Sequence, residues 1–134
     1  MDFLTCLLID CAKKAKNNLT KALQEYNITC RQAVVLRALS QVSITAKEIG
    51  ENTAIDKATL SAMLQKMIEN GLILSHSSDK DGREKIYSLT EEGNLLLPKV
   101  NAVEEQFRKQ VFGNLEKEEY ERLSGLLVTL KENL

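Results

Sequence analysis

The stretch that decides the fold is Thr45–Thr90, which reads TAKEIGENTAIDKATLSAMLQKMIENGLILSHSSDKDGREKIYSLT. Thr45 is followed three residues later by Glu48, which is the spacing of a capping box. In a capping box, the hydroxyl and the carboxylate each satisfy an unpaired amide at a helix start. We therefore expect a short helix from Ala46, interrupted at Asn52-Thr53.

Asp56 is the expected N-cap of a second helix, because its carboxylate can accept first-turn amides and suits the positive end of the helix dipole. Apolar residues then recur at helical spacing and form one stripe: Leu60, Leu64, Met67 and Ile68. Polar residues lie largely off this stripe: Lys57, Ser61, Gln65 and Glu69. Asn70-Gly71 should end the helix, since glycine adopts the left-handed C-cap conformation without steric cost.

A charged β-hairpin is expected after the second helix. Leu72–Leu74 is strand-like, Ser77–Gly82 is a loop that reverses the chain, and Arg83–Leu89 is the returning strand. Two helices joined by a tight turn and followed by a hairpin form a winged helix-turn-helix. The second helix of this motif enters the major groove of DNA.

These residues also resemble the MarR family of bacterial transcription regulators. The resemblance rests on the helix IDKATLSAMLQKMIENGLI, on the wing Asp81-Gly82-Arg83 and on Leu89-Thr90-Glu91-Glu92-Gly93, and it extends more weakly to Ile28–Leu39 and Leu115–Leu134. Two residues depart from the family pattern. Ser78 stands where many relatives have an acidic residue, and Ala62 stands where an arginine that bears on base reading is common.

Size and composition favour one mostly α domain. The chain has 134 residues, of which 43% are hydrophobic, 28% charged and only 4% aromatic, and alternating strand patterns are nearly absent outside the wing. We expect about six helices plus the hairpin wing. The net charge of −1 argues against a generic polyanion binder, although it leaves specific DNA binding open.

Other helices are expected on both sides of the central stretch. Thr29 with Gln32 forms a capping box for a helix that reaches about Ser40, and Val42–Ile44 could add a third strand. Thr90 begins a long helix that Pro98 should kink and that Gly113-Asn114 should end, and a last helix starts at Glu116.

The N-terminal segment Phe3–Asn27 is predicted as one helix whose first turns are apolar on several faces. Such a helix needs more than one partner, most simply a second copy of the chain, with a membrane-surface anchor as the weaker alternative. The MarR resemblance likewise implies that 1–27 and 91–134 are dimerisation helices around a winged-helix part at 28–90, within a single domain 1–134. It also implies a small-molecule cleft between these parts.

The candidate DNA contacts lie on the second helix and the wing. Arg83 is expected in the minor groove or on phosphate, with Asp81 holding its guanidinium by a charge-assisted hydrogen bond. Lys80 and Lys85 either contact phosphates or keep the wing soluble. On the helix the candidates are Lys57, Thr59, Ser61 and Gln65, and glutamine can read adenine edges. The alternative is that these helix residues belong to an ordinary solvated surface and contact no DNA.

The sequence offers little catalytic chemistry. His76 is the one histidine and has no nucleophile near it in sequence, and the cysteines show no metal-ligand spacing, so we expect no enzyme, metal or cofactor. Three cysteines and the absence of a secretory signal or spanning stretch indicate a reducing cytoplasm and no membrane. Cys6 near a helix start has two readings, inert packing or a redox sensor of the kind found in peroxide-sensing MarR proteins.

The sequence therefore predicts a homodimeric regulator, a repressor that binds a pseudo-palindromic double-stranded DNA operator and is released by a small-molecule or oxidative signal. The competing hypothesis is a winged-helix module that works through protein partners and has lost operator recognition.

Overall fold

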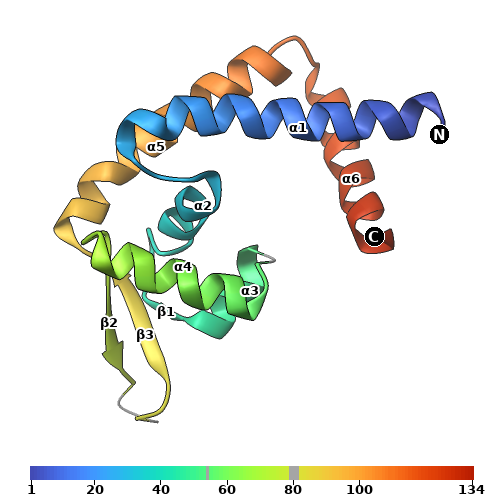
Figure 1. The fold of residues 1–134 in the computed structure, drawn as a ribbon. Helices are drawn as coiled ribbons and strands as arrows, with labels where there is room; N and C mark the ends of the chain where they lie inside the picture. The colour runs from blue at the N-terminus through green and yellow to red at the C-terminus, as the bar shows by residue number, and fades with distance from the viewer. Residues whose placement is uncertain (54, 79–81) are drawn as a thin grey trace. The chain divides into compact units, whose positions relative to one another are not determined.

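The computed structural model describes residues 1–53, 55–78 and 82–134 (Figure 1). They form two compact units, Met1–Val103 and Glu104–Leu134. In chain order the elements are α1 (Phe3–Leu23), the 3-10 helix η1 (Gln24–Tyr26), α2 (Cys30–Ala38), β1 (Ile44–Thr45), α3 (Ala46–Thr53), α4 (Lys57–Glu69), β2 (Ile73–Ser77), β3 (Lys85–Leu89), α5 (Glu91–Phe112) and α6 (Lys117–Asn133). Six α-helices and a hairpin in the described residues confirm the predicted winged helix-turn-helix fold.

The helix starts follow the predicted caps. The Thr45 hydroxyl accepts the Glu48 amide at 3.2 Å, and α3 begins at Ala46 as expected. The other half of the predicted capping box differs, because the Glu48 carboxylate accepts the Thr45 hydroxyl at 3.1 Å instead of a backbone amide. Thr29 and Gln32 form the predicted capping box of α2. Local hydrogen bonds that a few adjacent residues supply therefore fix these helix boundaries.

The N-terminal segment departs from the prediction. The single helix expected over Phe3–Asn27 ends at Leu23 and continues as the 3-10 helix η1. Asn27 then takes a left-handed conformation with φ of 54°, and its amide donates to the Gln24 carbonyl at 3.1 Å. Asparagine tolerates this conformation better than most residues, and it turns the chain toward α2.

A close-packed core holds the first unit together. Its most buried side chains come from the helices and the first strand of the hairpin: Val35, Leu36, Ile49, Leu64, Met67 and Ile73. Val100 of α5 is also buried in this cluster. The apolar stripe predicted on α4 is thus confirmed as a core-facing surface, with Leu60, Leu64 and Met67 buried.

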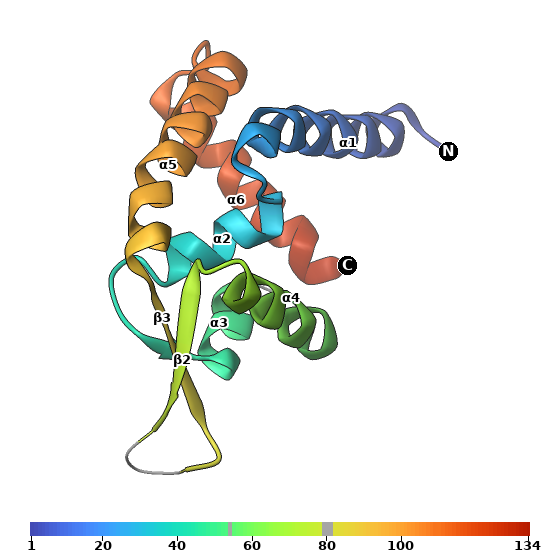
Figure 2. The same ribbon diagram turned by 60° about the vertical axis from the view of Figure 1, so that its left-hand side comes forward.

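The sheet has three antiparallel strands in the order β1-β3-β2. β2 pairs with β3 from Ile73↔Leu89 to Ser77↔Lys85, and Figure 2 shows this hairpin extending away from the helices of its unit. The third strand exists, but it is Ile44–Thr45 rather than Val42–Ile44. Val42 is 60% exposed and pairs with nothing in the ladder, whereas Ile44 is buried opposite Tyr87.

The second unit contains the last turns of α5 and all of α6. Phe107, Phe112 and Tyr120 form two edge-to-face aromatic pairs, with ring centroids 6.3 and 5.5 Å apart. Glu116 caps α6 through a reciprocal capping box with Glu119. α5 contains Pro98 and is continuous from Glu91 to Phe112, while the kink at Pro98 stays a prediction. Within the described residues, no helix is both long and apolar enough to cross a bilayer.

Candidate nucleic-acid interface

The start of α4 is fixed by Asp56. Its carboxylate accepts the Thr59 amide at 3.0 Å, and its carbonyl accepts the Leu60 amide at 2.9 Å. The hydrogen bond from Thr59 lowers the pKa of Asp56, and the nearby positive charge of Arg31 adds a smaller lowering. The predicted N-cap is confirmed, and it places Lys57 at the first position of the helix.

Three of the four DNA contacts predicted on α4 are exposed in the structure. Lys57, Ser61, Ala62 and Gln65 are exposed. Lys57 and Ser61 lie next to the buried stripe, because they line the same pocket as Leu60 and Leu64. Thr59 is only half-buried and its amide is used by Asp56, so it serves as a partner in the helix cap, and its DNA contact stays a prediction.

Gln65 has a neighbour on its own helix. Its side-chain amide lies 3.5 Å from the Glu69 carboxylate, at the limit of a hydrogen bond. Such a contact, four residues apart on a helix surface, is weak enough to be exchanged for a base edge. The contact with Glu69 therefore positions the Gln65 side chain on the surface, and its amide can still exchange this contact for a base edge.

The wing is a regular hairpin with cationic side chains near its end. Beyond the last ladder pair, the Ser78 amide donates to the Glu84 carbonyl at 2.9 Å. Arg83 and Lys85 are exposed. Lys80 and Asp81 lie outside the described residues, and so does the predicted bond between Asp81 and Arg83.

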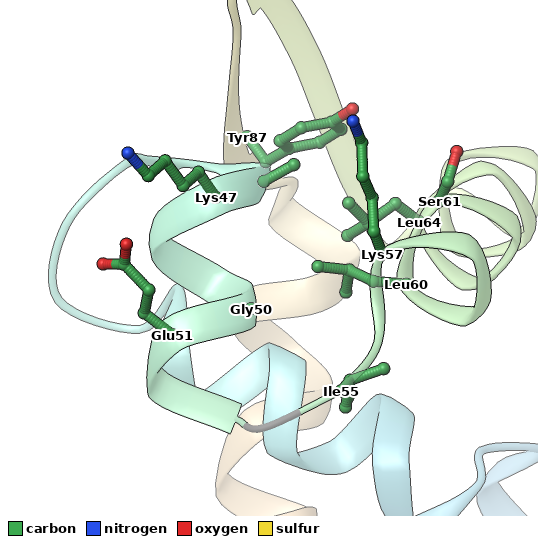
Figure 3. Close-up of a pocket in the computed structure, with 10 residues that line it drawn as sticks. Lys47, Gly50, Glu51, Ile55, Lys57, Leu60, Ser61, Leu64 and Tyr87 are labelled. Carbon is green, nitrogen blue, oxygen red and sulfur yellow. The ribbon is translucent and has the colours of Figure 1, made fainter.

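A pocket of about 530 Å³ lies between α3 and α4, beside Tyr87 of β3 (Figure 3). Apolar side chains and a glycine form much of its lining: Ala46, Gly50, Ile55, Leu60 and Leu64. Its polar lining consists of Lys47, Glu51, Lys57, Ser61 and Tyr87. Lys57 and Ser61 line this pocket and are also predicted DNA contacts. The pocket therefore opens directly beside the predicted DNA-contacting residues of α4.

Sequence reasoning missed Lys47 and Tyr87. Tyr87 lies two residues after Lys85 on β3, and its partners across the sheet are Ile44 and Ser75. That spacing is a usable signal, since residues two apart on a strand share a face. Lys47 gave no such signal, because a lysine one residue past a helix start is ordinary in sequence.

The cysteines and the histidine take separate positions. Cys6 is exposed in the first turns of α1, whereas Cys30 is half-buried with its sulfur 3.6 Å from the Thr20 hydroxyl oxygen. His76 lies exposed on β2 opposite Ile86. Over residues 1–53, 55–78 and 82–134, no three His, Cys, Asp or Glu side chains gather in a way that could hold a metal ion.

Comparisons with known proteins agree with this geometry. A family model described as transcriptional regulator SarA/Rot matches residues 17–100, more than half of the chain. The organic hydroperoxide resistance transcriptional regulator of Bacillus subtilis is 33% identical over 132 residues, covering 98% of this chain and 88% of that protein.

Solved structures show the same fold. A MarR-like transcription regulator from Bacillus cereus superposes with a TM-score of 0.81 at 26% identity, over 98% of this chain and 95% of the other. The S. aureus MepR-DNA complex superposes with a TM-score of 0.89 at 21% identity over the whole of both chains, a likeness that concerns the fold alone. By fold, sequence and matched family, the chain belongs to the MarR family of winged helix-turn-helix transcription regulators, which are not enzymes.

Proposed function

We propose that this chain is a repressor that binds a pseudo-palindromic operator as a homodimer, with one α4 helix in the major groove of each half-site. The observation that carries the proposal is the division of α4 into a buried apolar stripe and an exposed polar face beside a cationic wing. A helix presented in this way fits the major groove, and a flanking hairpin can reach the adjacent minor groove.

Each exposed residue of α4 has a distinct role in the proposal. Lys57, at the positive end of the helix, neutralises a phosphate. Gln65 and Ser61 contact base edges. Ala62 replaces an arginine-type contact with a methyl group, which suits the methyl group of thymine. The operator is therefore expected to contain A·T pairs opposite the middle of α4.

Arg83 and Lys85 supply the wing contacts. Both are exposed near the end of a hairpin that extends from the same unit as α4. A guanidinium inserted into a narrow minor groove is attracted by its strongly negative potential. Since the chain has a net charge of −1, this local concentration of cations has to supply the attraction that the chain as a whole lacks.

The exposed apolar residues of the terminal helices support dimerisation. In α1, Phe3 is 81% and Leu4 71% exposed, and in α6, Leu126 is 55% and Leu127 44% exposed. Soluble proteins rarely leave so many large apolar side chains in water, so a second copy is the expected cover. A homodimer also provides the two-fold symmetry that a pseudo-palindromic operator mirrors.

Two signals could release the protein from DNA. A small molecule in the pocket between α3 and α4 would meet Lys57 and Ser61, and so would compete with their DNA contacts. The pocket has an apolar floor with a few polar groups, which is the usual make-up of a ligand site.

Oxidation of Cys6 is the other candidate signal, and it is favoured by exposure of this thiol in the first turns of α1 and by the name of the B. subtilis relative. The thiolate sulfur would attack an organic hydroperoxide, giving a sulfenic acid and releasing the alcohol. Organic hydroperoxide should then release the wild type from its operator while Cys6→Ser stays bound. Release that persists in Cys6→Ser would exclude Cys6 and direct attention to the pocket.

The proposed function is tested by gel-shift with the DNA upstream of the protein's own gene, at two salt concentrations. Specific binding that weakens as salt rises is expected, because each phosphate contact releases counterions. If no sequence-specific complex forms with that DNA or with fragments selected from a random pool, the operator model fails and the protein-interaction hypothesis replaces it.

A further inference from the structure

The C-terminal end of α4 is closed by a Schellman motif. Gly71 has φ of +77°, its amide donates to the Ile68 carbonyl at 3.0 Å, and the Leu72 amide donates to the Met67 carbonyl at 3.0 Å. These bonds leave the carbonyls of Gly71 and Leu72 available as acceptors just past the end of the helix.

Thr90 uses both of these carbonyls. Its hydroxyl donates to the Gly71 carbonyl at 2.6 Å, and its amide donates to the Leu72 carbonyl at 3.1 Å. The same hydroxyl oxygen accepts the Gly93 amide at 3.1 Å, which satisfies a free donor in the first turn of α5. One threonine side chain therefore bonds the end of α4 to the start of α5.

Gly93 allows the two helix ends to come this close. A Cβ atom on Gly93 would clash with the Leu72 carbonyl oxygen. Gly93 is itself buried. Figures 1 and 2 both show the end of α4, the base of the hairpin and the start of α5 meeting at one place. Gly71, Leu72, Thr90 and Gly93 form what we call the α4–α5 joint.

We infer that Thr90 and Gly93 are positioning residues that fix the angle between the recognition helix and α5, and so set the half-site spacing that the dimer accepts. This inference rests on the proposed function. α5 runs from the joint past Val103 into the second unit, which carries the exposed apolar face of α6. If the dimer forms there, the joint is the hydrogen-bonded connection through which the dimer orients each α4.

The chain offers a sharp test of the joint. Thr90→Val keeps the shape of the side chain and removes both bonds of the hydroxyl, while Thr90→Ser keeps the hydroxyl. Gly93→Ala disrupts the joint independently, because its Cβ atom would clash with the Leu72 carbonyl oxygen. Thr29→Val is the matched control, because it removes a comparable part-buried cap hydrogen bond from a different helix, α2.

The first measurement needs no DNA. Spin labels are placed at Ser61 on α4 and at Leu95 on α5, both exposed, and each labelled protein is mixed with excess unlabelled chain so that most dimers carry one labelled copy. We expect a narrow distance distribution for the wild type, Thr90→Ser and Thr29→Val. Thr90→Val and Gly93→Ala should broaden it or shift it. An unchanged distribution in both variants overturns the inference, and circular dichroism confirms that each variant is folded.

The second measurement uses operators in which the half-sites are moved apart or together by one base pair. The wild type should lose about tenfold in affinity on either change, because a rigid dimer holds its two α4 helices at one separation and matches one half-site spacing. Thr90→Val should reduce that loss to about twofold, whereas Thr29→Val should keep it. A Thr90→Val protein with full spacing preference overturns the inference. If the wild type binds no operator, the proposed function fails, while the label distances still decide whether the joint is rigid.

Discussion

The winged-helix core and the terminal helices use similar apolar residues with opposite results. Leu36, Ile49 and Met67 of the core are fully buried, whereas Phe3 of α1 is 81% exposed and Leu126 of α6 is 55% exposed. Both sets repeat at helical spacing in the sequence. The difference is that side chains of α2, α3, α4 and the hairpin share one buried cluster, while large apolar residues of α1 and α6 are exposed in the described part of the chain.

This contrast shows what an amphipathic pattern does and does not specify. The pattern identifies which face of a helix avoids water, but it does not say whether the partner lies in the same chain or in another. In the core the partner is internal. For the terminal helices a second copy is our proposal, and the following variants test the two regions against each other.

The largest effect is expected in the core. Leu36→Ala removes a fully buried side chain from α2 and leaves a cavity, so we expect a loss of about 2–5 kcal/mol in the free energy of unfolding. Val34→Ala, on the same helix, is the matched control because Val34 is 46% exposed, and its change should stay within about 0.5 kcal/mol. Urea denaturation followed by circular dichroism measures both. Equal losses for the two variants would mean that the core is wrongly identified.

The next effect concerns assembly rather than folding. Leu127→Glu places a charge on the exposed apolar face of α6, so sedimentation should show more monomer at micromolar concentration while circular dichroism keeps its helical signal. Thr129→Glu adds the same charge on another face of α6 and should leave the dimer intact. A wild type that sediments as a monomer would sink the dimer proposal and, with it, the pseudo-palindromic operator.

Much of the fold could be predicted because its boundaries rest on local chemistry. Thr29, Thr45 and Asp56 each cap a helix through residues three positions away, and Gly71 ends α4 with a positive φ. The break at Asn27 and the position of β1 could not be predicted in the same way. The first is a 3-10 turn that the Asn27 amide closes by donating to the Gln24 carbonyl, with no side-chain signal in the sequence. The second depends on which residue of Val42–Thr45 pairs with Tyr87 across the sheet.

The candidate site was predictable only in part, for a similar reason. Helical periodicity distinguishes Ser61 and Gln65 from the buried stripe, and both are exposed in the structure. Lys47 and Tyr87 join Lys57 at the pocket only after α3 and β3 have packed together. The sequence predicts Thr90 as a helix start, yet its hydrogen bond to Gly71 joins residues 19 positions apart, and no local pattern predicts that contact.

DNA binding should depend on the wing more than on any single lysine. Arg83→Ala should weaken operator binding by ~1–3 kcal/mol, the usual cost of losing a specific arginine contact. Arg108→Ala is a suitable control, because it removes a cation from α5 that has no assigned DNA contact and pairs with Glu105. Fluorescence anisotropy with labelled operator measures both variants. Unchanged binding for Arg83→Ala would favour the protein-interaction hypothesis.

A smaller effect is expected for Lys57, whose proposed role is phosphate neutralisation. Lys57→Ala should weaken binding to all sequences about equally and reduce the slope of log affinity against log salt by about one. Lys14→Ala is the control, since Lys14 pairs with Asp10 on α1 and is not a predicted DNA contact. A lower affinity at unchanged slope would show that Lys57 acts through helix stability instead.

The smallest effect is a pH dependence at the cap of α4. The pKa of Asp56 is lowered in the folded state by its hydrogen bond to Thr59, so the unfolded chain binds this proton more readily. The contribution of Asp56 to stability is therefore complete above the ordinary carboxyl pKa and is lost as pH falls through the lowered pKa.

Asp56→Asn is the informative variant, because asparagine is also a good N-cap but does not titrate. The two proteins should differ in melting temperature by a few degrees at most at neutral pH, and the wild type should lose stability relative to Asp56→Asn on acidification. Thermal melts at constant ionic strength measure the difference in melting temperature between the wild type and Asp56→Asn. Carboxylates that both proteins share, such as Asp2 at the start of α1, titrate equally in the two and cancel in this difference. A difference that stays constant down to acid pH would show that the cap contributes equally in both protonation states of Asp56.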